Sequence, residues 1–230
     1  MDFFKTKIGK SGVLNGMTDY HSHILWGVDD GIRTQEECLA TLHLLEEVGV
    51  AELWCTPHIM EETPNCTEKL KERFELLKGA YTGPIGLHLA AENMLDGLFK
   101  ERLQQGDLLR HEGEYLLVET SYYNPPMKMR DTLQEILKAG FRPLLAHPER
   151  YVYMDDSDYE ELKDMGVDFQ LNLPSLGGAY GREPEQKALK LLKDGYYSKM
   201  GMDIHSLNFL RFVLDSKISK KVANLLERVK

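Results

Sequence analysis

The sequence contains few cysteines, and their spacing matches no metal-binding or catalytic motif. There are three in 230 residues, Cys38, Cys55 and Cys66. An odd number without a metal-type spacing predicts reduced thiols in a cytoplasmic protein. None has an arginine at the distance that the Cys-x5-Arg motif of cysteine-dependent phosphatases requires, because Arg73 lies one residue too far from Cys66. The sequence therefore excludes a cysteine-dependent phosphatase.

Several other motifs and segments are also absent. The chain has no Gly-x-Ser-x-Gly nucleophile elbow, no P-loop and no glycine-rich dinucleotide loop after a predicted strand. No apolar run is long enough for a signal peptide or a membrane span, so we expect no membrane insertion. Low-complexity tracts and hinge-like linkers are missing as well, which predicts a single domain over residues 1–230.

Positive charge is scarce relative to negative charge. The 28 lysines and arginines are outnumbered by 37 aspartates and glutamates, which gives a formal net charge of −9. Nucleic acids and anionic membranes would be repelled by such a chain, so neither is expected as a general partner. An anionic substrate would need local positive charge, from metal ions or from a few arginines.

What the sequence does contain is a regular alternation of strand and helix patterns. We predict strands over residues 18–24, 50–56, 87–91, 115–118, 142–146, 167–171 and 197–202. We predict helices over residues 34–48, 67–80, 96–104, 128–138, 159–165, 184–193 and 219–229. The strands recur about every 25 to 37 residues, the size of one βα unit, so an α/β fold with parallel strands closing into a barrel is expected.

A residue able to bind metal ends or follows each predicted strand. These residues are His21 and His23, His58, Glu92, Glu119, His147, Asn172, and Asp203 with His205. Side chains alternate along a strand, so His21 and His23 point the same way and can hold one ion. The adjacent Asp29 and Asp30 follow in a glycine-flanked loop that can fold over the same place. In βα barrels this rim carries the chemistry, which predicts a metal centre there.

The ligand set combines imidazole and carboxylate groups without thiolate. It suits two or three divalent ions such as manganese, zinc or iron, with open positions for water and substrate. Such a centre ionises a bound water and holds phosphoryl oxygens, and Glu92 could bridge two ions. Phosphate-ester hydrolysis is therefore the leading hypothesis, ahead of amide hydrolysis or deamination.

Two arginines lie close to candidate ligands in the sequence. Arg150 follows His147 by three residues, where its guanidinium can bind two phosphate oxygens. Arg211 follows His205 and either does the same from the opposite side or pairs with a surface acid. His43 and His111 are predicted to be surface residues.

The motifs taken together resemble those of a known superfamily. His-x-His with Asp-Asp-Gly, Thr-Pro-His, Ala-Glu, Val-Glu, Ala-His-Pro-Glu-Arg-Tyr and Asp-x-His are similar to the PHP (polymerase and histidinol phosphatase) superfamily. More narrowly, HSHILWGVDDG, CTPH, HPERY and MDIH resemble the manganese-dependent protein-tyrosine phosphatases of bacterial capsule and exopolysaccharide gene clusters. The resemblance covers residues 17–230, with residues 1–16 as an N-terminal extension, and implies a distorted seven-stranded (β/α) barrel.

The resemblance also implies a site with three metal ions. The first would be held by His21, His23, Glu92 and Asp203, the second by Glu92, Glu119 and His147, and the third by Asp30, His58 and His205. Asp29 is the alternative to Asp30. Arg150 matches the phosphate-binding arginine of the family, and Arg211 matches a second one less closely.

The implied activity is hydrolysis of phosphotyrosine on protein by direct attack of a metal-bound hydroxide. The implied substrate is the tail of a bacterial tyrosine kinase that regulates polysaccharide export. A small-molecule phosphatase such as histidinol phosphatase stays open, although Trp26, Tyr122, Tyr123 and Tyr151 favour an open aromatic surface. A nuclease or amidohydrolase and a non-catalytic metal-binding module are further alternatives, and no sequence feature indicates an oligomeric state.

Overall fold

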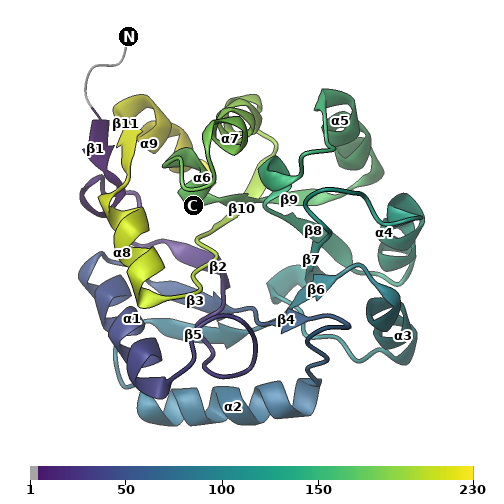
Figure 1. Cartoon of the computed structure of the whole chain (residues 1–230), viewed down its shortest axis with the longest axis horizontal. Coiled ribbons are helices and arrows are strands. Elements are labelled where there is room, and N and C mark those ends of the chain that lie inside the picture. Colours follow the sequence, from purple (N-terminus) through teal and green to yellow (C-terminus); the bar gives the residue numbers. More distant parts are fainter. Residues whose placement is uncertain (1–4, 230) are drawn as a thin grey trace.

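The structure is a computed structural model that describes residues 5–229. Parallel strands occupy the centre and helices surround them (Figure 1). The central strands are β2 (Thr18–Ser22), β3 (Glu52–Cys55), β4 (His58–Ile59), β5 (Gly86–Leu89), β6 (Glu92–Met94), β7 (Tyr115–Glu119), β8 (Arg142–Ala146), β9 (Asp168–Asn172) and β10 (Tyr197–Gly201). The predicted α/β fold is confirmed.

The surrounding helices follow the strands in the chain, as βα units require. They are α1 (Gln35–Glu47), α2 (Thr67–Ala80), α3 (Gly97–Gln105), α4 (Met129–Lys138), α5 (Asp156–Met165), α6 (Leu173–Leu176), α7 (Arg182–Asp194), α8 (Leu207–Asp215) and α9 (Lys220–Leu226). The Thr34 side chain accepts the Glu37 N–H and begins α1, as its capping-box spacing predicts. In the described part of the chain, no helix has the length and apolar character needed to cross a membrane.

Hydrogen bonding divides the parallel strands into two sheets. One has the order β10-β9-β8-β7-β6-β4 and the other the order β2-β3-β5. Between β3 and β4, the Ala90 N–H donates to the Cys55 carbonyl oxygen and the Glu92 N–H donates to the Pro57 carbonyl oxygen, whereas Pro57 has no N–H to donate. Within residues 5–229 no continuous ladder closes a ring, so the expected seven-stranded barrel is not confirmed. The two sheets meet where Ser22 forms a parallel bridge with Ile204.

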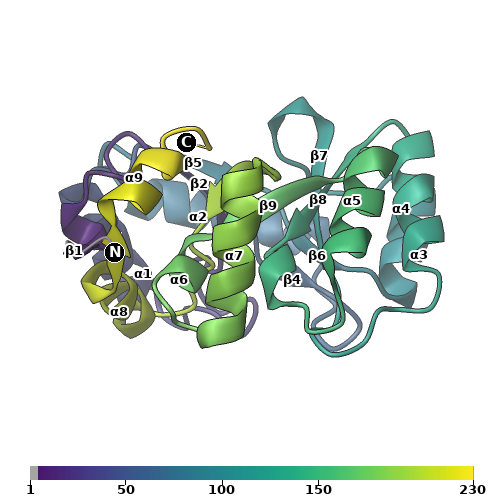
Figure 2. The same cartoon turned by 90° about the horizontal axis from the view of Figure 1, so that it is seen from above.

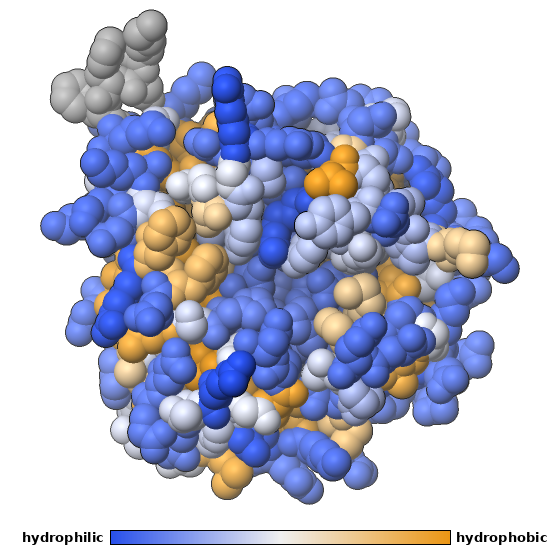
Figure 3. Space-filling view, viewed as in Figure 1, coloured by the Kyte–Doolittle hydropathy of each residue, from blue (hydrophilic) through white to orange (hydrophobic). Residues whose placement is uncertain are grey.

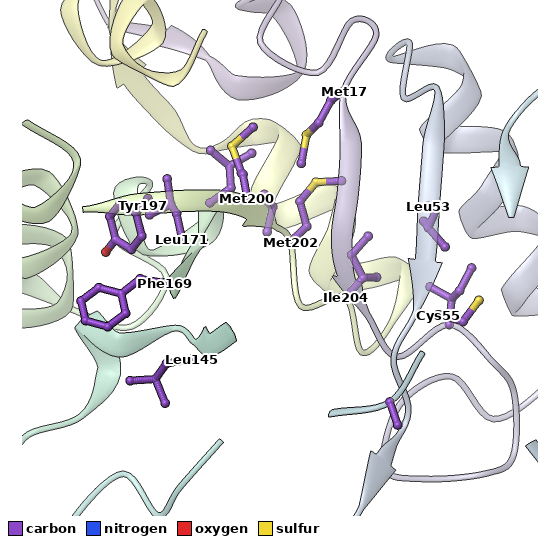
Figure 4. Close-up of a cluster of buried hydrophobic side chains, with 14 of the residues drawn as sticks. Met17, Leu53, Cys55, Leu145, Phe169, Leu171, Tyr197, Met200, Met202 and Ile204 are labelled. Carbon is purple, nitrogen blue, oxygen red and sulfur yellow. The ribbon is translucent and has the colours of Figure 1, made fainter. Parts of the chain in front are cut away.

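Strand residues alternate between two faces, as the pleat requires. Leu116, Val118 and Leu145 belong to the main apolar cluster. Tyr115 and Leu144 belong to a separate, smaller one. Figure 4 shows members of the main cluster on successive strands, including Leu145 on β8, Phe169 and Leu171 on β9, and Tyr197 and Met200 on β10. The strands therefore hold a large core on one side and present their other side to the centre of the molecule.

The two ends of the described chain pair with each other. Strand β1 (Lys5–Lys7) runs antiparallel to β11 (Lys217–Ser219), and both views place β1 and α9 at the same end of the molecule (Figures 1 and 2). Ile8, Val13 and Leu14, which follow β1, are buried in the main core. The expected extension over residues 1–16 therefore packs on the body from residue 5 onward, whereas residues 1–4 lie outside the described residues.

Helix α8 corrects the sequence-based interpretation of the segment after His205. That segment lies outside the predicted helices, yet the Ser206 side chain accepts the Phe209 N–H and begins a helix. Leu210, Val213 and Leu214 are buried on its inner face. This cap and this spacing were readable in the sequence.

Candidate metal centre

The predicted ligands converge at the carboxyl ends of the central strands. They line or lie beneath a cavity of about 460 Å³, whose wall also includes Met60, Met94, Tyr122, Tyr180 and Phe209. Figure 3 shows this face of the molecule hollowed near its middle, with hydrophilic residues around the hollow. The volume lies in the range of small-molecule binding sites.

His21 and His23 form the floor of the centre. His21 is on β2 and His23 follows its last residue, so the strand is shorter than predicted, but both side chains still face the same way. Their Nε2 atoms are 3.1 Å apart, and Oε2 of Glu92 lies 3.1 Å from the first and 3.2 Å from the second. All three residues are completely buried.

Glu92 is the residue that the other ligands share. Its Oε2 also lies 3.2 Å from His58 Nδ1, and its Oε1 lies 3.1 Å from His147 Nε2. Burial raises its pKa, but the surrounding histidines, His21 and His58 foremost, hold that pKa well below the usual range. Glu92 begins β6 and does not end the preceding strand, because β5 already stops at Leu89.

Asp30, and not Asp29, joins the exposed side of the centre. Asp30 Oδ1 is 3.5 Å from Nε2 of both His58 and His205, and hydrogen bonding from His205 lowers the pKa of Asp30 to about 2. Asp29 instead lies 2.8 Å from Nδ1 of His23 and accepts the His58 N–H. A carboxylate on the second nitrogen orients a histidine for metal binding, so Asp29 positions His23.

His147 and Asp203 enter from β8 and β10 on strained backbone. Their φ angles are +36° and +52°, a left-handed region that non-glycine residues rarely adopt. Asp203 Oδ1 is 3.4 Å from Nε2 of both His21 and His23. The sharp turns after these strands thus aim both side chains back over the strand ends.

The guanidinium group of Arg150 lies between two aromatic rings. Its guanidinium lies 4.4 Å from the Tyr122 ring centroid and 4.1 Å from that of Tyr180. Its Nη1 donates to Asp203 Oδ2 at 2.7 Å. Arg150 therefore lines the cavity while it pairs with a candidate metal ligand.

Buried Glu149 anchors the turn that carries His147 and Arg150. Its carboxylate accepts hydrogen bonds from the Asn172 N–H, the Ser175 hydroxyl and the Tyr197 hydroxyl. Burial raises the pKa of Glu149 to about 7. This anchor was not predicted, because its partners lie on β9, α6 and β10, far along the chain.

Some residues singled out in the sequence lie elsewhere. Arg211 is on the exposed side of α8 and does not line the cavity, whereas Phe209 of the same helix does. His111 is not a surface residue as predicted: it is 2% exposed and packs on Trp54, with its Nε2 3.0 Å from the Tyr20 carbonyl oxygen. Burial lowers the pKa of His111 to about 3. His43 is exposed, as predicted.

The expected open aromatic surface is smaller than the sequence indicated. Trp26 and Tyr151 are buried, whereas Tyr123 is 73% exposed. Tyr180 and Phe209 supply aromatic wall that was not predicted. No local sequence motif marks either residue, because the folding of segments distant in sequence brings each of them to the cavity.

The donor atoms of this centre fit divalent metal ions. They fall into four overlapping groups, each within 4.8 Å: His23, Asp30, His58 and His205; His21, His23 and Glu92; His21, His147 and Asp203; and His58, Glu92 and Glu119. Among the described residues, His58 Nδ1, Glu92 Oε2 and Glu119 Oε1 are buried without a hydrogen-bond partner. Buried polar atoms rarely stay unpaired, and this nitrogen and oxygen set suits manganese, zinc or iron.

The grouping differs in one respect from the ligand sets that the resemblance implies. Glu119 Oε1 lies 2.9 Å from His58 Nδ1, and His147 groups with His21 and Asp203. Glu119 and His147 were expected together on one ion. Glu119 still groups with Glu92, and His147 Nε2 lies 3.1 Å from Glu92 Oε1, so all nine expected ligands lie at one centre.

Comparison with known proteins agrees with this geometry. The tyrosine-protein phosphatase CpsB of Streptococcus pneumoniae is 30% identical over 84% of this chain and 84% of its own. The putative tyrosine-protein phosphatase CapC of Staphylococcus aureus is 26% identical over 86% of this chain and 80% of its own.

The fold has a solved counterpart as well. The crystal structures of YwqE from Bacillus subtilis and CpsB from Streptococcus pneumoniae, described as metal-dependent tyrosine phosphatases, provide a match with a TM-score of 0.77. The sequence identity is 22%, over 93% of this chain and 95% of the other. A family model for capsular polysaccharide synthesis, CpsB/CapC, matches residues 17–215. Because that match spans most of the sequence, this chain belongs to the CpsB/CapC family of capsular polysaccharide synthesis proteins.

Proposed function

We propose that this protein is a metal-dependent phosphatase that hydrolyses phosphotyrosine on protein. The observation that carries the proposal is the buried centre in which Glu92 touches four histidines while Arg150 stands beside it in the same cavity. The relatives named above are tyrosine-protein phosphatases. The substrate we infer is a tyrosine kinase that regulates capsule or exopolysaccharide export, and we infer that the protein acts in the cytoplasm.

We infer three ions, which we assign as manganese, held by the nine expected ligands of the centre. Divalent ions bound in this way ionise water at neutral pH and neutralise the charge of a phosphoryl group. Glu92 would bridge two of them, because its two oxygens face different histidines. Asp29 and Glu149 keep His23 and His147 in place. We also infer that the parallel strands form one distorted seven-stranded barrel, in which β3 with β4 and β5 with β6 are each one bent strand.

The cavity wall supplies groups for both halves of a phosphotyrosine. Met60, Met94 and Phe209 offer apolar contacts for the ring. Arg150 uses Nη1 for Asp203, and a guanidinium has five N–H donors, so others are available to phosphate oxygens. The same side chain thus binds the phosphoryl group and holds a metal ligand in its orientation.

Parallel kinetics on three substrates test the proposal. We expect kcat/KM on a phosphotyrosyl peptide to exceed that on histidinol phosphate by about a hundredfold or more, because only the former fills the apolar wall. Single-stranded DNA should not be cleaved, since the chain carries a net charge of −9. A higher kcat/KM on histidinol phosphate, or rapid DNA cleavage, would contradict the proposal.

Replacing Arg150 with lysine should lower kcat/KM by about tenfold to a thousandfold, or ~1.4–4 kcal/mol of transition-state stabilisation. A lysine keeps the charge beside Asp203 but cannot offer parallel N–H donors to two phosphate oxygens. Metal content and Tm should stay near those of the parent, and inorganic phosphate should inhibit the variant more weakly.

The matched control for this substitution is Arg130→Lys. Arg130 is an exposed arginine that pairs with Glu161 and Asp158 and does not line the cavity. Its replacement removes similar ion-pair geometry but should leave kinetics unchanged. Normal kinetics in Arg150→Lys, or a loss explained by unfolding alone, would rule out the role of Arg150.

A further inference from the structure

The cavity of the metal centre continues into a second hollow. The second hollow has a volume of about 380 Å³ and shares three lining residues with the cavity, namely Tyr122, Arg150 and Tyr180. Its other lining residues are Tyr123, Val152, Arg182, Glu183 and Pro184. The stacked Arg150 and its two tyrosines therefore form the ridge between the two spaces.

The floor of the second hollow is apolar and held in place. Tyr123 is 73% exposed and Val152 is 52% exposed, and both line this hollow, so their apolar surface is contiguous and open to solvent. The Val152 N–H donates to the Tyr122 carbonyl oxygen at 2.9 Å. This hydrogen bond joins the segment after β7 to the segment after β8, so the floor of the second hollow is formed without a bound ligand.

Arg182 gives this hollow its charge. It is the first residue of α7 and is exposed, and within residues 5–229 its side chain has no ion-pair or hydrogen-bond partner. The neighbouring Glu183 pairs with Lys187 at 3.4 Å. In a chain whose net charge is −9, an unpaired arginine at the edge of the substrate cavity is available to an anion.

We propose that the second hollow binds the residues of the phosphoprotein next to the phosphotyrosine, and that Arg182 selects a carboxylate side chain there. This inference rests on the proposed function. A phosphotyrosine seated at the metal centre leaves its main chain at the rim, and an extended chain advances only about 3.3–3.6 Å per residue. Because the two hollows share the ridge at Arg150, the residues on one side of the phosphotyrosine are within reach of the second hollow.

The surroundings of Arg182 favour a carboxylate over a second phosphate. Of the two guanidiniums that line the hollow, Arg150 already pairs with Asp203, so Arg182 is left to match one negative charge. Glu183 lies in the same lining, so a phosphate dianion would be less well compensated there. Tyr123 and Val152 offer apolar contact to the methylene groups of an aspartate or glutamate.

Two phosphotyrosyl peptide series test this assignment. They differ only in glutamate or glutamine, placed at one position at a time on either side of the phosphotyrosine. We expect the parent enzyme to prefer the glutamate peptide at one position by about fivefold in kcat/KM, mainly through KM. Arg182→Gln should abolish that preference and leave kcat/KM for phenyl phosphate, which has no carboxylate, unchanged.

A control substitution separates local charge from net charge. Lys193 lies on the same helix, is exposed and does not line either hollow. Lys193→Gln should retain the preference for glutamate. Arg182→Lys should retain part of it, because the charge stays but the fork of donors is lost.

Three results would overturn the inference. The first is equal loss on glutamate and glutamine peptides in Arg182→Gln, and the second is a matching loss on phenyl phosphate. The third is a preference of the parent for a second phosphotyrosine over glutamate, which would assign the hollow to phosphate. If no phosphotyrosyl compound is hydrolysed, the proposed function itself fails, and that outcome is distinct from all three.

Discussion

Replacing Glu92 with alanine is expected to lower kcat by at least about three orders of magnitude, or ~4 kcal/mol. The reason is that Glu92 Oε2 contacts His21, His23 and His58 while Oε1 contacts His147. Removing it should therefore empty or weaken two metal positions together. Mass-spectrometric metal analysis of the purified variant, alongside single-turnover kinetics, measures both effects.

His147→Ala provides the matched comparison for Glu92. It should also abolish most activity, but it should cost chiefly one metal ion, because His147 approaches only one oxygen of Glu92. Glu92→Gln keeps the shape and removes the charge, so metal loss in that variant identifies the carboxylate as the cause. Full metal occupancy in Glu92→Ala would eliminate the bridging role.

Chelation of divalent metal is expected to reduce phosphotyrosine hydrolysis to the background rate, and manganese should restore it. Three buried ligand atoms lack hydrogen-bond partners in the described residues, so the centre depends on cations to compensate them. Bound metal also stabilises the native state by mass action, so Tm should fall on chelation and recover on reconstitution.

A cysteine-free variant is the control for the metal mechanism. Burial raises the pKa of Cys38 to about 12 and that of Cys55 well above its usual range, so neither forms a nucleophilic thiolate. Cys66 is exposed but does not line the cavity. Replacing all three with serine should leave most activity. Complete loss in a folded variant would refute metal-based hydrolysis.

The ligands were predictable because their signals are local. Alternation along one strand places His21 and His23 together, and the position of each residue at a strand end places it on a common rim. The pairing of Glu119 with His58 could not be predicted in this way, because it depends on how neighbouring strands are offset in space. The positions of Tyr180 and Glu149 at the site could not be predicted from the sequence for the same reason.

The fold departs from the prediction in its strand pairing and in the capping of one helix. Hydrogen bonding places β3 and β4 in different sheets, and the expected closed barrel is not confirmed. Ser206 starts a helix that turns Arg211 outward and Phe209 toward the cavity. The residues that the resemblance implies as ligands lie together at one centre, but the orientation of α8 follows from this chain's own cap and apolar spacing.

The pairing of β1 with β11 sets the order in which the chain completes its fold. The contact between Lys7 and Asp215 spans 208 residues of sequence, and the Ile8 N–H donates to the Ser216 carbonyl oxygen beside it. During synthesis β1 therefore has no partner strand until residues 217–219 have emerged, and such distant pairings form slowly. Asp203 and His205 emerge only shortly before β11. A nascent chain consequently acquires the last of its candidate ligands and strand β11 at almost the same moment, so the full ligand set cannot assemble before that point.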